Sequence, residues 1–404
     1  MSFISRLGLW PQTGTNSTGL IVASTAIATA AVLSLLRSYL WPTPPKIDRS
    51  PLRTVLPTLS PDELNRLEYK PDSFPGARDV ETPYGSIRVY EWGPLTGEKV
   101  VFVHGISTSC MTLSKLAHAL VNEKGCRVML FDLFGRGFSD NPSDLPHDAR
   151  LYTTQILIAL ASSTEISWTG PNAFKLVGYS LGGGIAVHFA TAFPHLVSSL
   201  VLLAPAGLIR PESFGALSRA VFTSGLVPPR LLAWITRQRL KKPIRESGKR
   251  SNGGGSRTPA SRPDPVAASL SETAPLLGGP GGGGSRPEPR NALEQRVLRD
   301  VHWQLAHHAG FVPAFMSCIR HAPLVGQHAA WAKLADRAPG TTVIILGEGD
   351  EIIDPVEYVH DARPLVGGPE KVAWAVVPGG HDFPMTSAED TLAEMYKAWG
   401  WPLF

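Results

Sequence analysis

The chain has 404 residues, of which 43% are hydrophobic and 18% are charged, and its formal net charge at pH 7 is +4. This length and apolar content exclude disorder along the whole chain, and a mean hydropathy of +0.01 excludes a protein with many membrane spans. Its three cysteines, Cys110, Cys126 and Cys318, are too few and too widely spaced for a disulfide framework or a clustered zinc site. The 39 glycines and 36 prolines indicate either many tight turns or a disordered block.

An uncharged apolar stretch occupies residues 19–36, after a polar tail at residues 1–18. Eighteen helical residues span roughly 27 Å, which is close to the thickness of a bilayer core. More positive side chains follow the stretch than precede it, so the positive-inside rule places the bulk of the chain on the cytosolic side. The sequence therefore predicts a single-pass membrane anchor.

Three alternatives to an anchor remain open. A cleaved signal peptide has a basic start that leads directly into its apolar core, whereas here about a dozen polar residues intervene. A mitochondrial transit peptide fits the frequent serine and threonine and the absence of acidic residues before Asp48. A buried helix of a soluble domain is the third alternative.

Residues 41–77 are proline-rich and polar, which predicts an extended connector. From residue 78 onward, two strands around a turn at 83–85 are followed by short apolar strands that alternate with helices. Strands that are nearly all apolar are typical of a parallel sheet covered by helices on both faces. We therefore expect an α/β core formed by residues 78–207 and 338–404.

Residues 208–337 interrupt this alternation. Both ends of the interval have apolar residues at helical spacing, which predicts a helical cap inserted into the core. Between them, residues 245–290 form a tract of glycine, proline, serine and arginine that cannot bury enough apolar surface to fold. The cap is therefore predicted to contain a disordered insertion.

The strongest chemical motif surrounds Ser180. The segment Gly178-Tyr179-Ser180-Leu181-Gly182 follows an apolar strand and opens a helix of small residues. A G-x-S-x-G motif in this context forms a sharp strand-to-helix turn that exposes the serine hydroxyl at the carboxyl edge of the sheet. Ser180 is therefore the candidate nucleophile.

A nucleophilic serine needs a base and an acid that orients it. His381 lies in the loop after the apolar strand at 374–377, and Asp350 lies in the loop after the apolar strand at 343–346. Both loops are therefore expected at the same sheet edge as Ser180. The chain order Ser, Asp, His is the order expected for this architecture. Asp354 is a second candidate for the acid.

Acyl transfer also needs donors for a developing oxyanion. The backbone N–H of Leu181, first in the helix after Ser180, is one candidate, and that of Ile106, in the loop after the strand at 100–103, is the other. We expect the side chain of His104 to shape this loop rather than to react.

The ordered set of motifs resembles the α/β-hydrolases with a cap domain. The matching residues are His104-Gly105, residues 132–139, the turn at Ser180, the loop with Asp350, and Gly380-His381. The resemblance implies an eight-stranded sheet with one antiparallel strand, a Ser-His-Asp triad, a cap after the sixth strand and no cofactor. Relatives that open epoxides or remove halides carry aspartate as the nucleophile, so serine at position 180 indicates acyl chemistry.

These observations predict a membrane-anchored serine hydrolase of carboxylic esters, plausibly lipid-like such as a monoacylglycerol. A thioesterase, lactonase, C–C hydrolase or acyltransferase that acts on a specialised metabolite is the alternative enzyme. A catalytically silent binding protein is a further alternative, although such a protein has no physical need for Ser180, Asp350 and His381 together. We expect an acyl substrate and the membrane as partners, and no nucleic acid, because no recognised module accompanies the positive charge.

Overall fold

The computed structural model describes residues 17–40, 45–171, 173–210, 231, 234 and 292–403. The N-terminal tail up to residue 16, the first cap helices and the insertion predicted at 245–290 lie outside the described residues, apart from Leu231 and Trp234.

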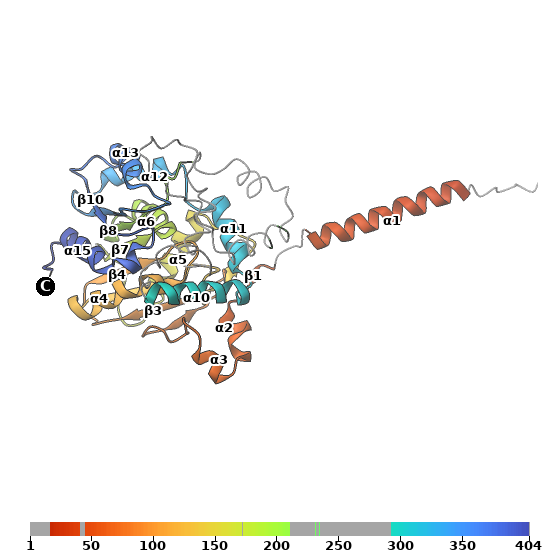
Figure 1. Ribbon diagram of the computed structural model, residues 1–404, viewed down its shortest axis with the longest axis horizontal. Coiled ribbons are helices and arrows are strands. Elements are labelled where there is room, and N and C mark those ends of the chain that lie inside the picture. Colours follow the sequence, from red (N-terminus) through yellow and green to blue (C-terminus); the bar gives the residue numbers. More distant parts are fainter. Residues whose placement is uncertain are drawn as a thin grey trace, which may run out of the picture.

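The described residues form one eight-stranded sheet, with strand order β10-β9-β8-β7-β4-β5-β3-β2 (Figure 1). The strands are β2 (Arg78–Val80), β3 (Ile87–Trp92), β4 (Lys99–Val103), β5 (Arg127–Phe131), β7 (Phe174–Tyr179), β8 (Val197–Leu203), β9 (Thr342–Gly347) and β10 (Val372–Val377). Among these strands, β3 alone runs in the direction opposite to the others: it pairs antiparallel with both β2 and β5, and the other pairs are parallel. This confirms the predicted mostly parallel eight-stranded sheet with one antiparallel strand.

Helices cover both faces of the sheet, which explains why the central strands are apolar throughout. The helices of the core are α4 (Ser114–Lys124), α5 (Ala149–Ala161), α6 (Leu181–Ala192), α13 (Pro355–Leu365), α14 (Phe383–Thr386) and α15 (Ala388–Trp399), with a 3₁₀ turn η2 at Cys110–Leu113. From β4 the chain crosses to β5 in one direction, and from β7 it crosses to β8 in the other. Because such crossovers are right-handed, α4 and α6 lie on opposite faces. Helix α15 packs on α4, and α5 packs on α6.

The apolar N-terminal stretch forms helix α1 (Ser17–Leu40), which is longer at both ends than the predicted span of 19–36. Among the described residues, α1 is the one helix long and apolar enough to cross a membrane, over residues 21–40, and it is not buried against the rest of the chain. In Figure 1 it projects away from the sheet and its helices. A buried soluble helix, one of the alternatives, is therefore excluded.

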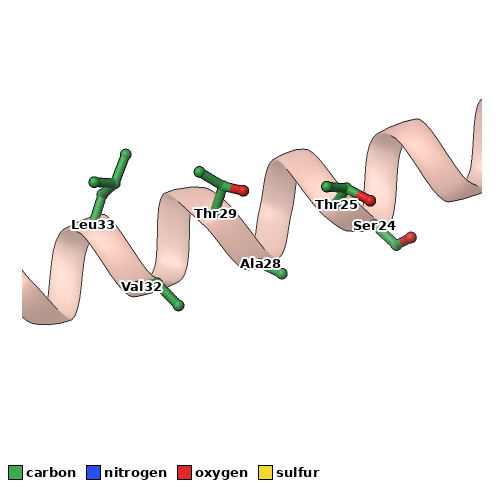
Figure 2. A pocket seen from close by; sticks show the side chains of 6 residues that line it. All are labelled: Ser24, Thr25, Ala28, Thr29, Val32 and Leu33. Carbon is green, nitrogen blue, oxygen red and sulfur yellow. The ribbon is translucent and has the colours of Figure 1, made fainter.

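Helix α1 also accommodates its polar side chains internally. The hydroxyls of Ser24 and Thr25 both donate to the Ile21 carbonyl, so these side chains are satisfied without water. Figure 2 shows Ser24, Thr25, Ala28, Thr29, Val32 and Leu33 lining a shallow hollow along α1. The residues that line this hollow all belong to α1, and none belongs to the α/β core.

The prediction of an extended connector at residues 41–77 is wrong for the part that the structure describes. This part contains β1 (Ile47–Asp48), α2 (Pro51–Thr54), η1 (Leu56–Thr58) and α3 (Pro61–Asn65), and β1 pairs with β6 (Asn141–Pro142). Tyr69 and Phe74 are buried, and the Tyr69 hydroxyl donates to Asp132 at 2.8 Å. Proline limits regular structure in this segment, but its few aromatic side chains dock it onto the core.

The described part of the predicted cap consists of α10 (Ala292–His307), α11 (Phe311–His321), α12 (His328–Ala332) and η5 (Lys333–Asp336). This part lies between β8 and β9, so it follows the sixth strand of the sheet, as expected. However, α12 packs against α6 and α13, and Trp331 is fully buried there. The predicted core boundary at residue 338 is therefore late, because the core resumes at α12.

Candidate active site

Ser180 lies between β7 and α6 in a strained backbone conformation, with φ 53° and ψ −119°. A positive φ is costly for a residue with a Cβ and persists only where the surroundings enforce it. A Cβ on Gly178 would lie 2.4 Å from the Gly182 carbonyl oxygen, and a Cβ on Gly182 would lie 2.1 Å from that of Val103. Helix α6 therefore begins too close to β7 and to the end of β4 for any residue but glycine at positions 178 and 182.

The structure brings Ser180, His381 and Asp350 together. His381 Nε2 lies 3.0 Å from Ser180 Oγ, and His381 Nδ1 lies 2.8 Å from Asp350 Oδ2. Ser180 follows β7, Asp350 lies in the loop after β9, and His381 lies in the loop after β10. These strands lie close together in the order β10-β9-β8-β7, so their carboxyl ends bring the three side chains to one edge of the sheet. All three are buried, so water competes little for their hydrogen bonds.

Asp350 is held in place through its second carboxylate oxygen. Oδ1 accepts the backbone N–H groups of Ile352 and Ile353, both at 2.8 Å. These bonds fix the orientation of the carboxylate toward His381. Asp354, the alternative acid, instead caps the N-terminus of α13, where its side chain accepts the N–H groups of the first turn. The geometry thus favours Asp350 over Asp354.

The two candidate oxyanion donors lie beside Ser180. Leu181 is the first residue of α6, and the first N–H groups of a helix have no acceptor within it. Ile106 is buried in the loop after β4. A Cβ on the preceding residue, Gly105, would lie 3.5 Å from the Cβ of Ser180, so this loop passes directly beside the serine.

His104 shapes this loop, as expected, and does so with both ring nitrogens. Nε2 accepts the Leu133 N–H at 2.9 Å, which assigns the ring proton to Nδ1. Nδ1 then donates to the Gly105 carbonyl at 2.9 Å. The ring therefore ties the loop after β4 to the loop after β5.

Two contacts around His381 were not predicted. The Tyr179 hydroxyl donates to the backbone carbonyl of His381 at 3.0 Å, and Glu351 Oε2 accepts its N–H at 3.4 Å. Partial loss of hydration raises the pKa of the Glu351 carboxyl, and the nearby His381 opposes this increase. Tyr179 belongs to the motif around Ser180, but no sequence pattern predicts that its hydroxyl bonds to the His381 carbonyl.

A buried network of polar side chains holds the loops after β4 and β5 in place. Asp132 accepts the N–H groups of Cys110 and Phe138, which belong to the loops after β4 and β5. Asp300 of α10 accepts from the Ser109 hydroxyl at 2.8 Å and from Gln304 at 2.6 Å. Burial raises the pKa of Asp300 to about 7. The sequence signal for this network was Asp300 and Gln304, two polar residues four positions apart among the apolar positions of a predicted helix.

Among the described residues, no three histidine, cysteine, aspartate or glutamate side chains gather into a group that could hold a metal ion. The three cysteines are all buried and unpaired by disulfides.

A family model described as alpha/beta hydrolase fold matches residues 99–233. This chain has the α/β-hydrolase fold. The structure of a bacterial membrane phospholipase A superposes on it with a TM-score of 0.54 at 17% identity, covering 95% of this chain and 98% of that one. That likeness shows the shared fold.

Curated relatives match a shorter region of this chain. A serine hydrolase-like protein of Dictyostelium discoideum is 29% identical over 146 residues, which is 35% of this chain and 39% of that one. The lipase LipV of Mycobacterium tuberculosis is 32% identical over 120 residues, which is 30% of this chain and 42% of that one. The chain thus spans about two fifths of the length of these relatives. The fold and these matches together support hydrolase activity.

Proposed function

We propose that this chain is a membrane-anchored serine hydrolase that cleaves carboxylic esters of lipid-like substrates through an acyl-enzyme on Ser180. The observation that carries the proposal is the hydrogen-bonded series from Ser180 Oγ to His381 Nε2 at 3.0 Å and from His381 Nδ1 to Asp350 at 2.8 Å. A hydroxyl is a weak nucleophile by itself, and this series supplies both the base and the group that orients it.

In the proposed mechanism, His381 removes the proton of Ser180 as the hydroxyl attacks the acyl carbon. The N–H groups of Ile106 and Leu181 stabilise the oxyanion, and His381 then protonates the leaving alcohol. Water enters, His381 takes its proton, and a second tetrahedral intermediate releases the acid. Asp350 stays ionised and stabilises the imidazolium that forms in each half of the reaction.

The proposed substrate class follows from the anchor. Helix α1 is unburied and, over residues 21–40, apolar enough to cross a membrane. An anchored enzyme meets its highest substrate concentration among amphipathic esters in the membrane. The match to a lipase supports this class without identifying the substrate. We place the hydrolase domain on the cytosolic side, with the mitochondrion as the alternative location, and assign no role to nucleic acid or to a cofactor.

A hydrolysis panel tests the function. The full-length chain in detergent should release acid from p-nitrophenyl esters and from monoacylglycerols, with kcat/KM rising from short to medium or long acyl chains. Preference for thioesters, lactones or vinylogous diketones would replace the ester assignment with the alternative acyl or C–C hydrolase. No turnover of any acyl compound would overturn the function and favour a binding protein.

A further inference from the structure

Arg136 is a buried cation in the loop after β5. Its exposed fraction is 1%, and none of the carboxylates in the described part of the chain forms an ion pair with it. A buried charge without a counter-ion is expensive, so it persists only where neutral acceptors satisfy it fully. The acceptors here are the carbonyls of Ile106 and Gly135, which receive Nε and a terminal nitrogen.

Ile106 is the residue that carries a proposed oxyanion donor, and both of its peptide units are held through their carbonyls. The unit whose N–H belongs to Ile106 is held by the bond from His104 to the Gly105 carbonyl. The next unit is held by the bond from Arg136 to the Ile106 carbonyl. Because each peptide unit is planar, these two bonds together fix the direction of the Ile106 N–H.

The guanidinium also contacts the predicted cap. Its centre lies 5.0 Å from the ring centroid of Phe311, and a terminal nitrogen lies 4.0 Å from the sulfur of Cys318. Both residues belong to α11, so the guanidinium contacts this helix as well as the loop that carries Ile106. A cation over an aromatic face is attracted to it, most strongly where water is excluded.

Two buried histidines, His147 and His308, lie near the Arg136 guanidinium. Burial, followed by the charge of Arg136, lowers the pKa of His147 to about 3. Burial lowers the pKa of His308 to about 4, and Arg136 again contributes while the bond to Ser139 opposes. Both rings are therefore neutral near pH 7 and add no positive charge beside Arg136.

We propose that Arg136 is a positioning residue that holds the Ile106 oxyanion donor and couples it to the packing of α11. The inference rests on the proposed acyl transfer at Ser180. Arg136 does not touch the substrate. It fixes the donor before the reaction, and its charge favours the anionic tetrahedral intermediate over the neutral ester.

The test compares Arg136→Met and Arg136→Lys with Arg127→Lys in the full-length chain. Arg127 is a matched control because it is also buried, but it lies at the start of β5, whereas Arg136 lies in the loop after the end of that strand. Arg127 pairs there with Glu91. Arg136→Met should lower kcat about 10- to 100-fold with KM changed less than about threefold, and Arg136→Lys should restore part of the loss. Arg127→Lys should leave kcat unchanged.

The affinities of two inhibitors distinguish a role of Arg136 in positioning the oxyanion donor from a role in stabilising the fold alone. A trifluoromethyl ketone forms a tetrahedral adduct with an oxyanion, and its affinity should fall across the variants in proportion to kcat/KM. The affinity of the corresponding methylene analogue, which cannot form the adduct, should stay within about twofold because it binds only in the ground state. If Arg136→Met does not fold, Phe311→Leu provides the test from the α11 side, with a smaller loss of kcat and the same proportionality.

An unchanged ketone affinity in folded, less stable variants would overturn the positioning role while leaving the proposed function intact. Absence of both turnover and ketone adduct in the wild-type chain would instead overturn the proposed function, and this inference with it.

Discussion

The hydroxyl of Tyr179 donates to the backbone carbonyl of His381 across 3.0 Å, joining the residue before the candidate nucleophile to the candidate base. The two rings also pack together, with centroids 5.4 Å apart. The loop that carries His381 is therefore held against the end of β7, and the distance between Ser180 and His381 depends on this contact.

The first prediction concerns Tyr179→Phe, which removes this bond and keeps the ring. Because one such hydrogen bond is worth about 1 kcal/mol, we expect kcat to fall about three- to tenfold. Steady-state kinetics with a p-nitrophenyl ester measures it. The control is Tyr358→Phe, since the Tyr358 hydroxyl is buried without a partner in the described residues and should change kcat little. Equal kinetics for both variants would contradict a role for Tyr179.

The second prediction separates the two candidate acids. Asp350→Asn should lower kcat by about 10³- to 10⁴-fold, because the imidazole loses the group that fixes its tautomer. Asp354→Ala should keep kcat and lower the free energy of unfolding by about 1 kcal/mol, because it removes a helix cap. Kinetics and urea unfolding of both variants provide the measurement. The reverse pattern would make Asp354 the acid.

The sequence predicted the three reacting side chains, but it did not predict the contacts that hold them in position. Ser180, His381 and Asp350 each follow an apolar strand, and parallel strands bring such loops to one edge regardless of their packing. The contact between Tyr179 and His381 joins residues 202 positions apart and depends on the path of a loop, which no local pattern encodes. A signal was available for Asp354, because Asp before Pro355 is typical of a helix start.

The segment that joins α1 to the core shows a different limit. Its prolines are equally typical of an extended connector and of short turns packed on a domain. The docking depends on single aromatic residues such as Tyr69, which stacks on Phe138 with centroids 4.8 Å apart. A prediction from average composition does not detect the effect of such single residues, so it did not predict that this segment packs on the core.

The third prediction concerns pH and Asp300. Its pKa is about 7 in the folded chain, raised from an ordinary 3.8 mainly by burial and further by Asp132 and Glu68. Between these values the folded chain holds a proton that the unfolded chain has lost, so this residue makes stability fall as the pH rises from about 4 to about 7. Asp300→Asn cannot ionise, so the variant should gain stability relative to wild type between pH 5 and pH 8, by at most roughly 3 kcal/mol.

Urea unfolding at the two pH values measures this difference. Asp361→Asn is the control, because the arginine contact lowers the pKa of Asp361 to about 2 and the group is ionised at both pH values. Its difference from wild type should therefore be independent of pH. A pH-independent difference for Asp300→Asn as well would show that Asp300 is already ionised in the folded chain.

The fourth prediction tests the anchor. In the full-length chain, Ile27→Lys combined with Ala31→Lys places two charges at the middle of α1, each costing about 2.5–3.5 kcal/mol to insert. Wild type should remain in the membrane pellet after alkaline carbonate treatment, and the double variant should be released. Asn65→Lys, which adds a charge on exposed α3, should behave as wild type. Release of the wild-type chain by carbonate would contradict a membrane span.

Covalent labelling of Ser180 by a fluorophosphonate tests the central claim most directly. Mass spectrometry of the labelled full-length chain should place the adduct on Ser180, Ser180→Ala should carry none, and His381→Ala should react at least about 10³-fold more slowly, because the hydroxyl loses its base. An adduct that persists in Ser180→Ala, or a folded wild-type chain that forms none, would contradict the account.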